Sequence, residues 1–168
     1  FSSNSAADRG GAIRLETPYE TPITDCTFTG NSTTNHLLGQ GGAMFCDGNT
    51  LSLSGCIFSA NEAAASGGGV HATGSTISMT QCSFSNNVAA DTGGGMYISA
   101  TSYMDLDTCT FIGNSAGETG GGIYSSEDAG LTMTSCDGQQ NQPNDLSFGE
   151  SISVSFPATD APVTGDAD

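Results

Sequence analysis

The chain has 168 residues, a length that suits a single domain. Its 18 acidic residues are balanced by only two arginines and no lysine, and the formal net charge of −16 argues against binding to nucleic acids or anionic lipid. Such a surface attracts cationic partners and divalent cations, and it suits an exterior in which salt screens the self-repulsion. No stretch approaches about 18 consecutive apolar residues, so the sequence predicts no membrane-spanning helix.

One repeat runs along most of the chain and begins each time with Phe-x-x-Asn. Each copy continues into a glycine pair that leads to an aliphatic residue, as in Gly41-Gly-Ala-Met44. The phenylalanines are separated by 27, 30, 26 and 27 residues, and they are Phe1, Phe28, Phe58, Phe84 and Phe111. A fixed period of this size is the signature of a stacked solenoid, in which each repeat buries its apolar side against its neighbours.

Within each repeat, apolar residues at every second position predict short strands with one buried face. One strand precedes a cysteine, the second contains that cysteine and the phenylalanine, and the third follows the glycines. The cysteines that mark this spacing are Cys26, Cys56, Cys82, Cys109 and Cys136. The apolar parity shifts by one just before each cysteine, so we expect a bend or bulge at Asp25, Gly55, Gln81, Thr108 and Ser135.

About three strands and three corners per repeat predict an all-β fold, a parallel β-helix with about five rungs and a partial capping rung. Like residues then stack about 4.8 Å apart on neighbouring rungs. We expect the Asn of each repeat to lie at a corner, in a left-handed conformation and with its amide bonded to the next Asn. Residues 1–154 form the predicted β-helix, a segment of a larger protein, and residues 155–168 form an acidic tail or linker.

The Phe-x-x-Asn and Gly-Gly-Ala-[Ile/Leu/Val] motifs resemble the repeats of the polymorphic outer-membrane protein family. The resemblance covers Phe1 to about Val154, with Asn144-Asp145 in place of the glycine pair in the last repeat. Similar repeats occur in other large surface proteins with a right-handed β-helix. The resemblance implies a right-handed parallel β-helix at the cell surface, and in that family the passengers are adhesins whose two motifs are implicated in adhesion.

The six cysteines leave two interpretations open. Five of them occupy one interior column, and Cys46 lies in the interior column of the third strand, a pattern that favours reduced thiols used as small apolar groups. A secreted location would permit disulfides between neighbouring rungs. In-register parallel neighbours, however, rarely offer the Cβ geometry that a disulfide requires.

The residue after the aliphatic position points outward and carries a ring in four consecutive repeats: Phe45, His71, Tyr97 and Tyr124. This aromatic stripe is the leading candidate for contact with sugar rings or a protein partner. The alternative is an aromatic ladder that packs under a loop.

Two outward columns of the first strand consist mostly of Ser and Thr, with one rung that carries Asp105 and Asp107. The two carboxylates point the same way about 7 Å apart, and with neighbouring oxygens they are candidate calcium ligands. Paired carboxylates also serve β-helical polysaccharide hydrolases, but the chain has no lysine and no arginine at a matching repeat position. Asn31-Ser-Thr33 is the one N-glycosylation sequon.

These patterns predict a non-enzymatic, extracellular segment of a surface or appendage protein, used as a rigid spacer and as an adhesion or assembly surface. Its expected partners are other chains of a surface assembly or a host or glycan ligand, with calcium as the one candidate cofactor. Two alternatives stay open: a β-helix that binds or cleaves glycans, and an ice-binding face made of the Ser and Thr columns.

Overall fold

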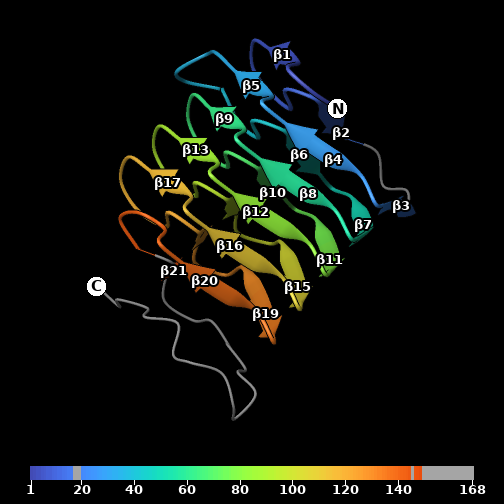
Figure 1. Cartoon of the computed structure of the whole chain (residues 1–168). Coiled ribbons are helices and arrows are strands. Elements are labelled where there is room, and N and C mark those ends of the chain that lie inside the picture. The colour runs from blue at the N-terminus through green and yellow to red at the C-terminus, as the bar shows by residue number, and fades with distance from the viewer. Residues whose placement is uncertain (17–19, 145, 149–168) are drawn as a thin grey trace.

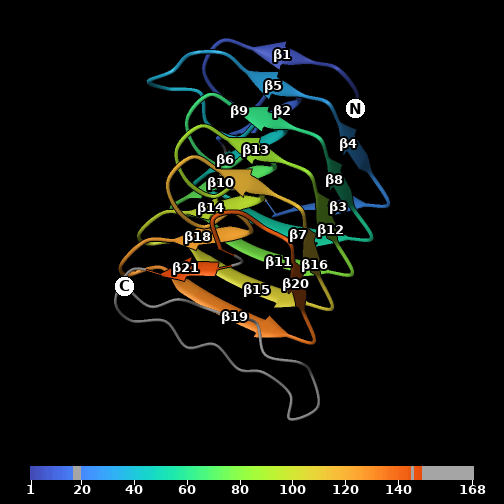
Figure 2. The same ribbon diagram turned by 60° about the vertical axis from the view of Figure 1, so that its left-hand side comes forward.

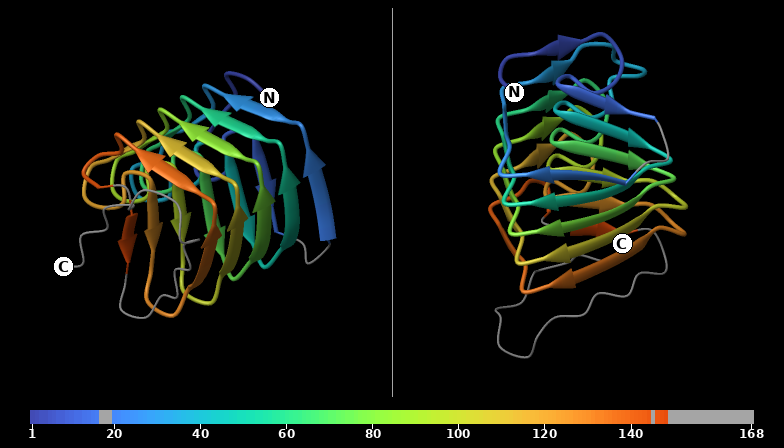
Figure 3. Two further views of the ribbon diagram at one scale, coloured as in Figure 1. Left: turned by 60° about the horizontal axis from the view of Figure 1, so that its bottom comes forward. Right: turned by 90° about the vertical axis from the view of Figure 1, so that its right-hand side faces the viewer.

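The computed structural model describes residues 1–16, 20–144 and 146–148, and in them the chain winds into a stack of rungs around one axis (Figure 1 and Figure 3). The strands form four parallel sheets, each of which contains one strand from every successive rung. The predicted tail at 155–168 lies outside the described residues. Among the described residues, no helix is long and apolar enough to span a membrane.

Two of the sheets meet at the corner that precedes each cysteine. The hydroxyl sheet consists of β3 (Glu20–Thr24), β7 (Thr50–Ser54), β11 (Thr76–Thr80), β15 (Tyr103–Asp107) and β19 (Gly130–Thr134). The phenylalanine sheet consists of β4 (Thr27–Thr29), β8 (Ile57–Ser59), β12 (Ser83–Ser85), β16 (Thr110–Ile112) and β20 (Asp137–Gln139).

The other two sheets lie on either side of the glycine turns. The ladder sheet consists of β2 (Ile13–Leu15), β6 (Met44–Asp47), β10 (Val70–Thr73), β14 (Met96–Ile98), β18 (Ile123–Ser125) and β21 (Leu146–Phe148). The corner sheet consists of β1 (Ser5–Ala6), β5 (Ser32–Thr33), β9 (Glu62–Ala63), β13 (Val88–Ala89) and β17 (Ser115–Ala116). The corner sheet adds a fourth strand per rung to the three that the sequence predicts, and its two-residue strands are too short to produce a visible alternation.

The core is built from columns of like side chains, as the repeat predicts. In the phenylalanine sheet, consecutive rings from Phe28 to Phe111 stack with centroids 4.7 Å apart and planes within 7° of parallel. All four rings are at most 1% exposed. Aliphatic residues of the hydroxyl and ladder sheets complete the same core, including Leu53, Met79 and Met96. Burial of each such side chain contributes about 1.5–3 kcal/mol.

The predicted bend before each cysteine is confirmed. Asp25, Gly55, Gln81, Thr108 and Ser135 all have a left-handed backbone, with φ between 51° and 62°. A single left-handed residue turns the chain from the hydroxyl sheet into the phenylalanine sheet, and the turn brings the apolar parity of both sheets to the inside.

The predicted asparagine ladder is also confirmed, and its members from Asn31 to Asn141 are buried. From Asn4 to Asn114, each Asn of the ladder donates a hydrogen bond from Nδ2 to Oδ1 of the Asn on the next rung, at 2.8–2.9 Å, and Asn141 is the last acceptor. The expectation that these asparagines adopt the left-handed conformation is wrong. The preceding residues adopt it instead, and they are Ser3, Gly30, Ala60, Asn86, Gly113 and Gln140.

The glycine pairs meet two different requirements. The first glycine of each pair has a left-handed backbone, with φ between 62° and 71° at Gly10, Gly41, Gly67, Gly93 and Gly120. The second lies against the backbone of the neighbouring rung, so a Cβ on Gly94 would lie closer than 3.0 Å to the carbonyl oxygens of Ser115 and Gly121. Real Cβ atoms essentially never show such a separation, so the second position excludes every side chain.

Candidate functional site

The aromatic stripe is a continuous stack on the outer side of the ladder sheet. Phe45, His71, Tyr97 and Tyr124 are in register, with ring centroids 5.3, 4.5 and 5.2 Å apart. Their exposure, however, differs from the prediction, because Phe45 is 1% and His71 3% exposed. Tyr97 and Tyr124 are half-buried. The prediction of an exposed contact surface is therefore wrong for Phe45 and His71.

The chain itself covers these rings. The loops between the corner sheet and the ladder sheet bulge from one side of the stack (Figure 2), and they bring Ser66 within 3.0 Å of the His71 ring. The Arg9 guanidinium lies 4.8 Å from the centroid of the Phe45 ring. The alternative of a ladder under a loop thus describes Phe45 and His71.

His71 is the buried titratable group of this ladder. Its Nδ1 lies 3.0 Å from Ser66 Oγ and its Nε2 lies 3.2 Å from Thr73 Oγ1, so both ring nitrogens have hydroxyl partners. Burial lowers the pKa of His71 to about 3, the contact with the Ser66 backbone opposes this effect, and the nearby Arg9 charge adds to it. The imidazole is therefore neutral at physiological pH.

This burial makes the stability of the fold depend on pH. In the unfolded chain His71 titrates near 6.5, so at lower pH the unfolded state binds a proton that the folded state excludes. The contribution of His71 is complete above about pH 6.5 and is lost as the pH falls towards 3. His71→Phe keeps a ring in the stack but cannot bind a proton. Denaturant unfolding at pH 7.5 and 5.0 should show that the native chain loses about 2 kcal/mol more than the variant over this range.

A matched substitution exists at His36, which lies in an exposed loop. His36→Phe makes the same chemical change at an exposed position and should lose as much stability as the native chain between pH 7.5 and 5.0. Equal losses for the native chain and His71→Phe would contradict the assignment.

Asn31, the candidate glycosylation site, is inaccessible in the folded chain. Asn31 is fully buried, and its Nδ2 donates to Asn61 Oδ1 at 2.9 Å and to the Phe1 carbonyl at 3.2 Å. A glycan on this nitrogen would replace one of its two hydrogens, break one of these hydrogen bonds and find no room beside the fully buried side chain, so the sequon is a coincidence of the ladder residue with the Ser and Thr that follow it.

Asp105 and Asp107 lie on the outer face of the hydroxyl sheet and are both exposed, as predicted. Asp105 is in register between Ser78 and Thr132. The Thr108 hydroxyl donates to Asp107 at 3.0 Å. Among the described residues, no group of three or more His, Cys, Asp or Glu side chains is placed to hold a metal ion, so calcium binding here stays a prediction.

The structure adds a third outward column to this face, which the sequence analysis missed. It consists of Glu20, Thr50, Thr76, Tyr103 and Gly130, in register across the sheet. Tyr103 is 64% exposed, and its ring lies over the next rung, where a Cβ on Gly130 would lie 2.6 Å from the ring Cε1. These residues recur in the sequence six positions before each cysteine, one position before the alternating residues from which the strand was predicted.

Two shallow hollows, each of about 370 Å³, lie along this face. Glu20, Pro22 and Ser52 line the first, and Tyr103, Asp105 and Thr132 line the second. Both are bordered by Thr76 and Ser78, so they are neighbours along the sheet face, and we call the pair the hydroxyl groove. Pro22 and Asp105 interrupt its hydroxyl columns, which weakens the regular array that an ice-binding face needs.

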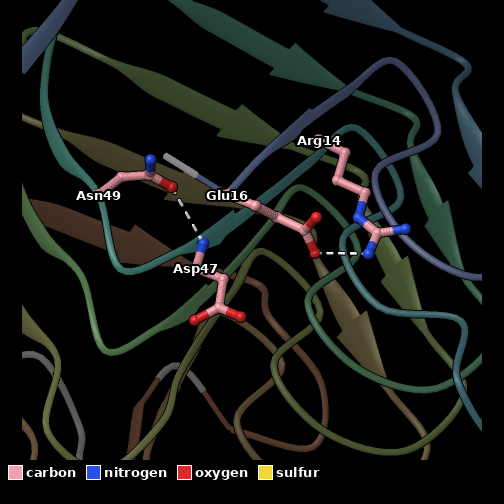
Figure 4. Close-up of polar contacts among 4 residues, drawn as sticks. All are labelled: Arg14, Glu16, Asp47 and Asn49. Atoms are coloured by element: carbon pink, nitrogen blue, oxygen red, sulfur yellow. Dashed lines mark hydrogen bonds and ion pairs between the residues drawn. The ribbon is translucent and has the colours of Figure 1, made fainter. Parts of the chain in front are cut away.

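A second buried polar ladder lies at the corner between the ladder and hydroxyl sheets, and it too was missed. The Asp47 amide donates to Asn49 Oδ1 at 3.0 Å (Figure 4), and the Asn49 and Ser75 amides donate to the hydroxyls of Ser75 and Ser102 on successive rungs. Figure 4 also shows the salt bridge between Arg14 and Glu16, which are both exposed. Such an exposed pair contributes little to stability.

All six cysteines are free, and all but the half-buried Cys26 are buried. The thiols of Cys56, Cys109 and Cys136 each donate to a backbone carbonyl of the preceding rung at 3.5 Å. Burial raises the pKa of the Cys46 thiol well above its ordinary value. The cysteines thus fill the core as small side chains, the first of the two interpretations.

The family of this chain follows from comparison with known proteins. No curated protein and no solved structure matches the chain. The family model described as a right-handed beta helix region matches residues 11–159, a range that contains nearly all of the rungs described above. The chain therefore belongs to the right-handed β-helix family.

Proposed function

We propose that this chain is a non-enzymatic, extracellular segment of a surface or appendage protein, which acts as a rigid spacer and presents a contact face for adhesion or assembly. The observation that carries the proposal is the set of uninterrupted ladders that connect every rung to the next. Phenylalanines stack at 4.7 Å from Phe28 to Phe111, and asparagine hydrogen bonds of 2.8–2.9 Å continue without a break from Asn31 to Asn141.

Stiffness follows from these ladders. Bending the stack would separate ring pairs and lengthen buried hydrogen bonds on one side, and buried polar groups are costly to leave unpaired. A repeat protein of this kind behaves as a one-dimensional stack in which each rung contacts only its neighbours. Such a body is suited to hold a contact face at a fixed distance from its anchor.

The hydroxyl groove is the face that we assign to contact. Its two neighbouring hollows together extend over five strands, whereas Phe45 and His71 of the aromatic stripe are buried. Asp105 is the one acidic side chain that lines the hollow near Tyr103, and no lysine or arginine lines either hollow. A single carboxylate without a second acid or a basic neighbour favours binding over glycosidic cleavage, which supports a non-catalytic role.

The resemblance to the polymorphic outer-membrane proteins supports the same proposal. In that family the Phe-x-x-Asn and Gly-Gly-Ala motifs are implicated in adhesion. In this chain the Phe and Asn of the motif are buried from the second copy to the fifth, as Phe58 and Asn61 show. We therefore propose that the motifs support adhesion indirectly, since they build the rigid body that presents the groove.

The test measures adhesion and catalysis with the same protein. Beads carrying the chain through a C-terminal biotin are placed on surfaces coated with the chain itself, with a basic protein or with a neutral glycan, and the force needed to detach them is recorded. We expect retention on at least one surface. Ser78→Lys, in the groove, should abolish retention, and Ser85→Lys, on the outward side of the phenylalanine sheet, should preserve it.

Two outcomes contradict the proposal. Detachment from all three surfaces at the force that frees uncoated beads would show that the face makes no contact. New reducing ends, released when the chain is incubated with neutral and acidic polysaccharides, would show that the groove is catalytic.

A further inference from the structure

We propose that the hydroxyl groove binds an extended, basic peptide segment of a partner protein, with one arginine over Tyr103 beside Asp105 and a second basic residue at Glu20. This inference rests on the proposed contact function and specifies the chemistry of the partner. It starts from an exposed aromatic residue, Tyr103, in a sheet face that the described part of the chain leaves uncovered.

The Tyr103 ring is held in place for stacking. It lies across Gly130 on the next rung, where any side chain would collide with it. It nevertheless leaves 64% of the residue exposed. A planar guanidinium stacks on such a ring and can at the same time pair with a carboxylate. Asp105 supplies that carboxylate, since it lines the same hollow two residues along the strand.

Charge complementarity selects a basic occupant. The groove is bordered by Glu20 at one end and Asp105 at the other, and no basic side chain lines it. The whole chain carries a formal charge of −16. An acidic glycan would be repelled, and a neutral glycan would leave the two carboxylates without partners, whereas a basic segment is attracted over a distance and pairs on arrival.

The geometry also sets the spacing of the basic residues. Glu20 and Tyr103 lie in one column three rungs apart, which corresponds to about 14 Å at the strand spacing of a sheet. In an extended peptide, residues four apart point to the same side and are about 13 Å apart. The Ser and Thr hydroxyls between the two acidic ends can then bond the intervening backbone. The predicted pattern is therefore Arg-x-x-x-Arg.

The test titrates the isotope-labelled full chain with the capped peptide GRTSTRG at low salt and follows backbone amide shifts by NMR. We expect shifts confined to the strands of the hydroxyl sheet. Tyr103→Ala and Asp105→Asn should each weaken binding about fivefold, the effect of losing one cation–π contact or one charge pair. Tyr103→Phe, which keeps the ring, should bind nearly as the native chain does. The lysine peptide GKTSTKG should bind more weakly, because an ammonium group does not stack as a guanidinium does.

Asp137→Asn is the matched control, because it removes the same charge from an exposed position of the phenylalanine sheet. Its affinity for GRTSTRG should stay within about twofold of the native value. If Asp137→Asn weakens binding as much as Asp105→Asn does, the attraction is non-specific and the inference is wrong. The inference also fails if GRTSTRG causes no shifts at millimolar concentration, or if a neutral or acidic oligosaccharide shifts the groove amides and the peptide does not.

The two proposals can fail separately. If the peptide does not bind but bead retention still depends on Ser78, the partner chemistry is wrong and the contact function stands. If retention is absent as well, the proposed function itself is wrong.

Discussion

Gly94→Ala should destabilise the fold by roughly 3 kcal/mol or more. The added methyl group meets backbone atoms that cannot move aside, so the loss of stability should lie at or above the upper end of the range for overpacked sites. The new Cβ would collide with the carbonyl oxygens of Ser115 and Gly121 on the next rung. Backbone atoms cannot rotate away as a side chain can, so the two rungs must separate. That separation also strains the hydrogen bond from the Gly94 amide to the Gly120 carbonyl, which is 3.0 Å long. Denaturant unfolding followed by circular dichroism measures the loss.

Gly48→Ala provides the matched control for this substitution. Gly48 has φ 66° but no atom within 4 Å of an added Cβ, so alanine there meets only backbone strain. We expect a cost of about 1–2 kcal/mol. If both variants lose the same stability, the close approach of the rungs is not what requires glycine at position 94.

Asn87→Ala should cost about 4 kcal/mol, because it removes a side chain with four buried hydrogen bonds. Asn87 Oδ1 accepts from the amide and the side chain of Asn61, and its Nδ2 donates to the Phe58 carbonyl and to Asn114 Oδ1. After truncation, the Asn61 amide and the Phe58 carbonyl lose these partners in the interior. A loss of this size is a large fraction of the total stability of a typical domain, so unfolding should begin at a much lower denaturant concentration.

The neighbouring Asn86 provides a control, because it is an asparagine that lies outside the buried ladder. Asn86 is exposed and has φ 53°, a conformation that glycine adopts freely. Asn86→Gly should therefore change the free energy of unfolding by less than about 1 kcal/mol. Comparable losses in Asn86→Gly and Asn87→Ala would contradict the role of the buried ladder.

Much of the fold could be predicted because the same local information is repeated in every rung. The left-handed bend at Gln81 follows from a one-residue shift of parity, and the same shift recurs at Thr108 and Ser135. Equal spacing then aligns each rung with the next, which places Phe84 on Phe111 and Asn87 on Asn114 without further information.

The errors occurred where the result depends on several segments at once. Parity correctly placed Phe45 and His71 on the outer side of the ladder sheet. Their burial, however, depends on Ser66 and Arg9, which belong to loops with little periodicity. The left-handed residue at each asparagine corner was misplaced by one position, because Ala60 carries no sequence signal for φ above zero.

The hydroxyl groove shows the same limit. Its groups come from five rungs, and the position of Tyr103 depends on the missing side chain of Gly130, which lies 27 residues further along the chain. Tyr103 and Gly130 belong to consecutive repeats, so a pattern sought within one repeat cannot reveal their contact.

The sequence by itself determined the β-helix, its register and the residues that form its core, since strand alternation and a constant period are properties of the chain read one repeat at a time. Only the tertiary structure decided which outward residues solvent reaches. Exposure depends on how each loop returns over the neighbouring rung and on whether the rung beside an outward residue carries a side chain. For that reason Phe45 and His71 of the aromatic stripe proved to be covered, whereas Tyr103 in the hydroxyl groove proved to be exposed.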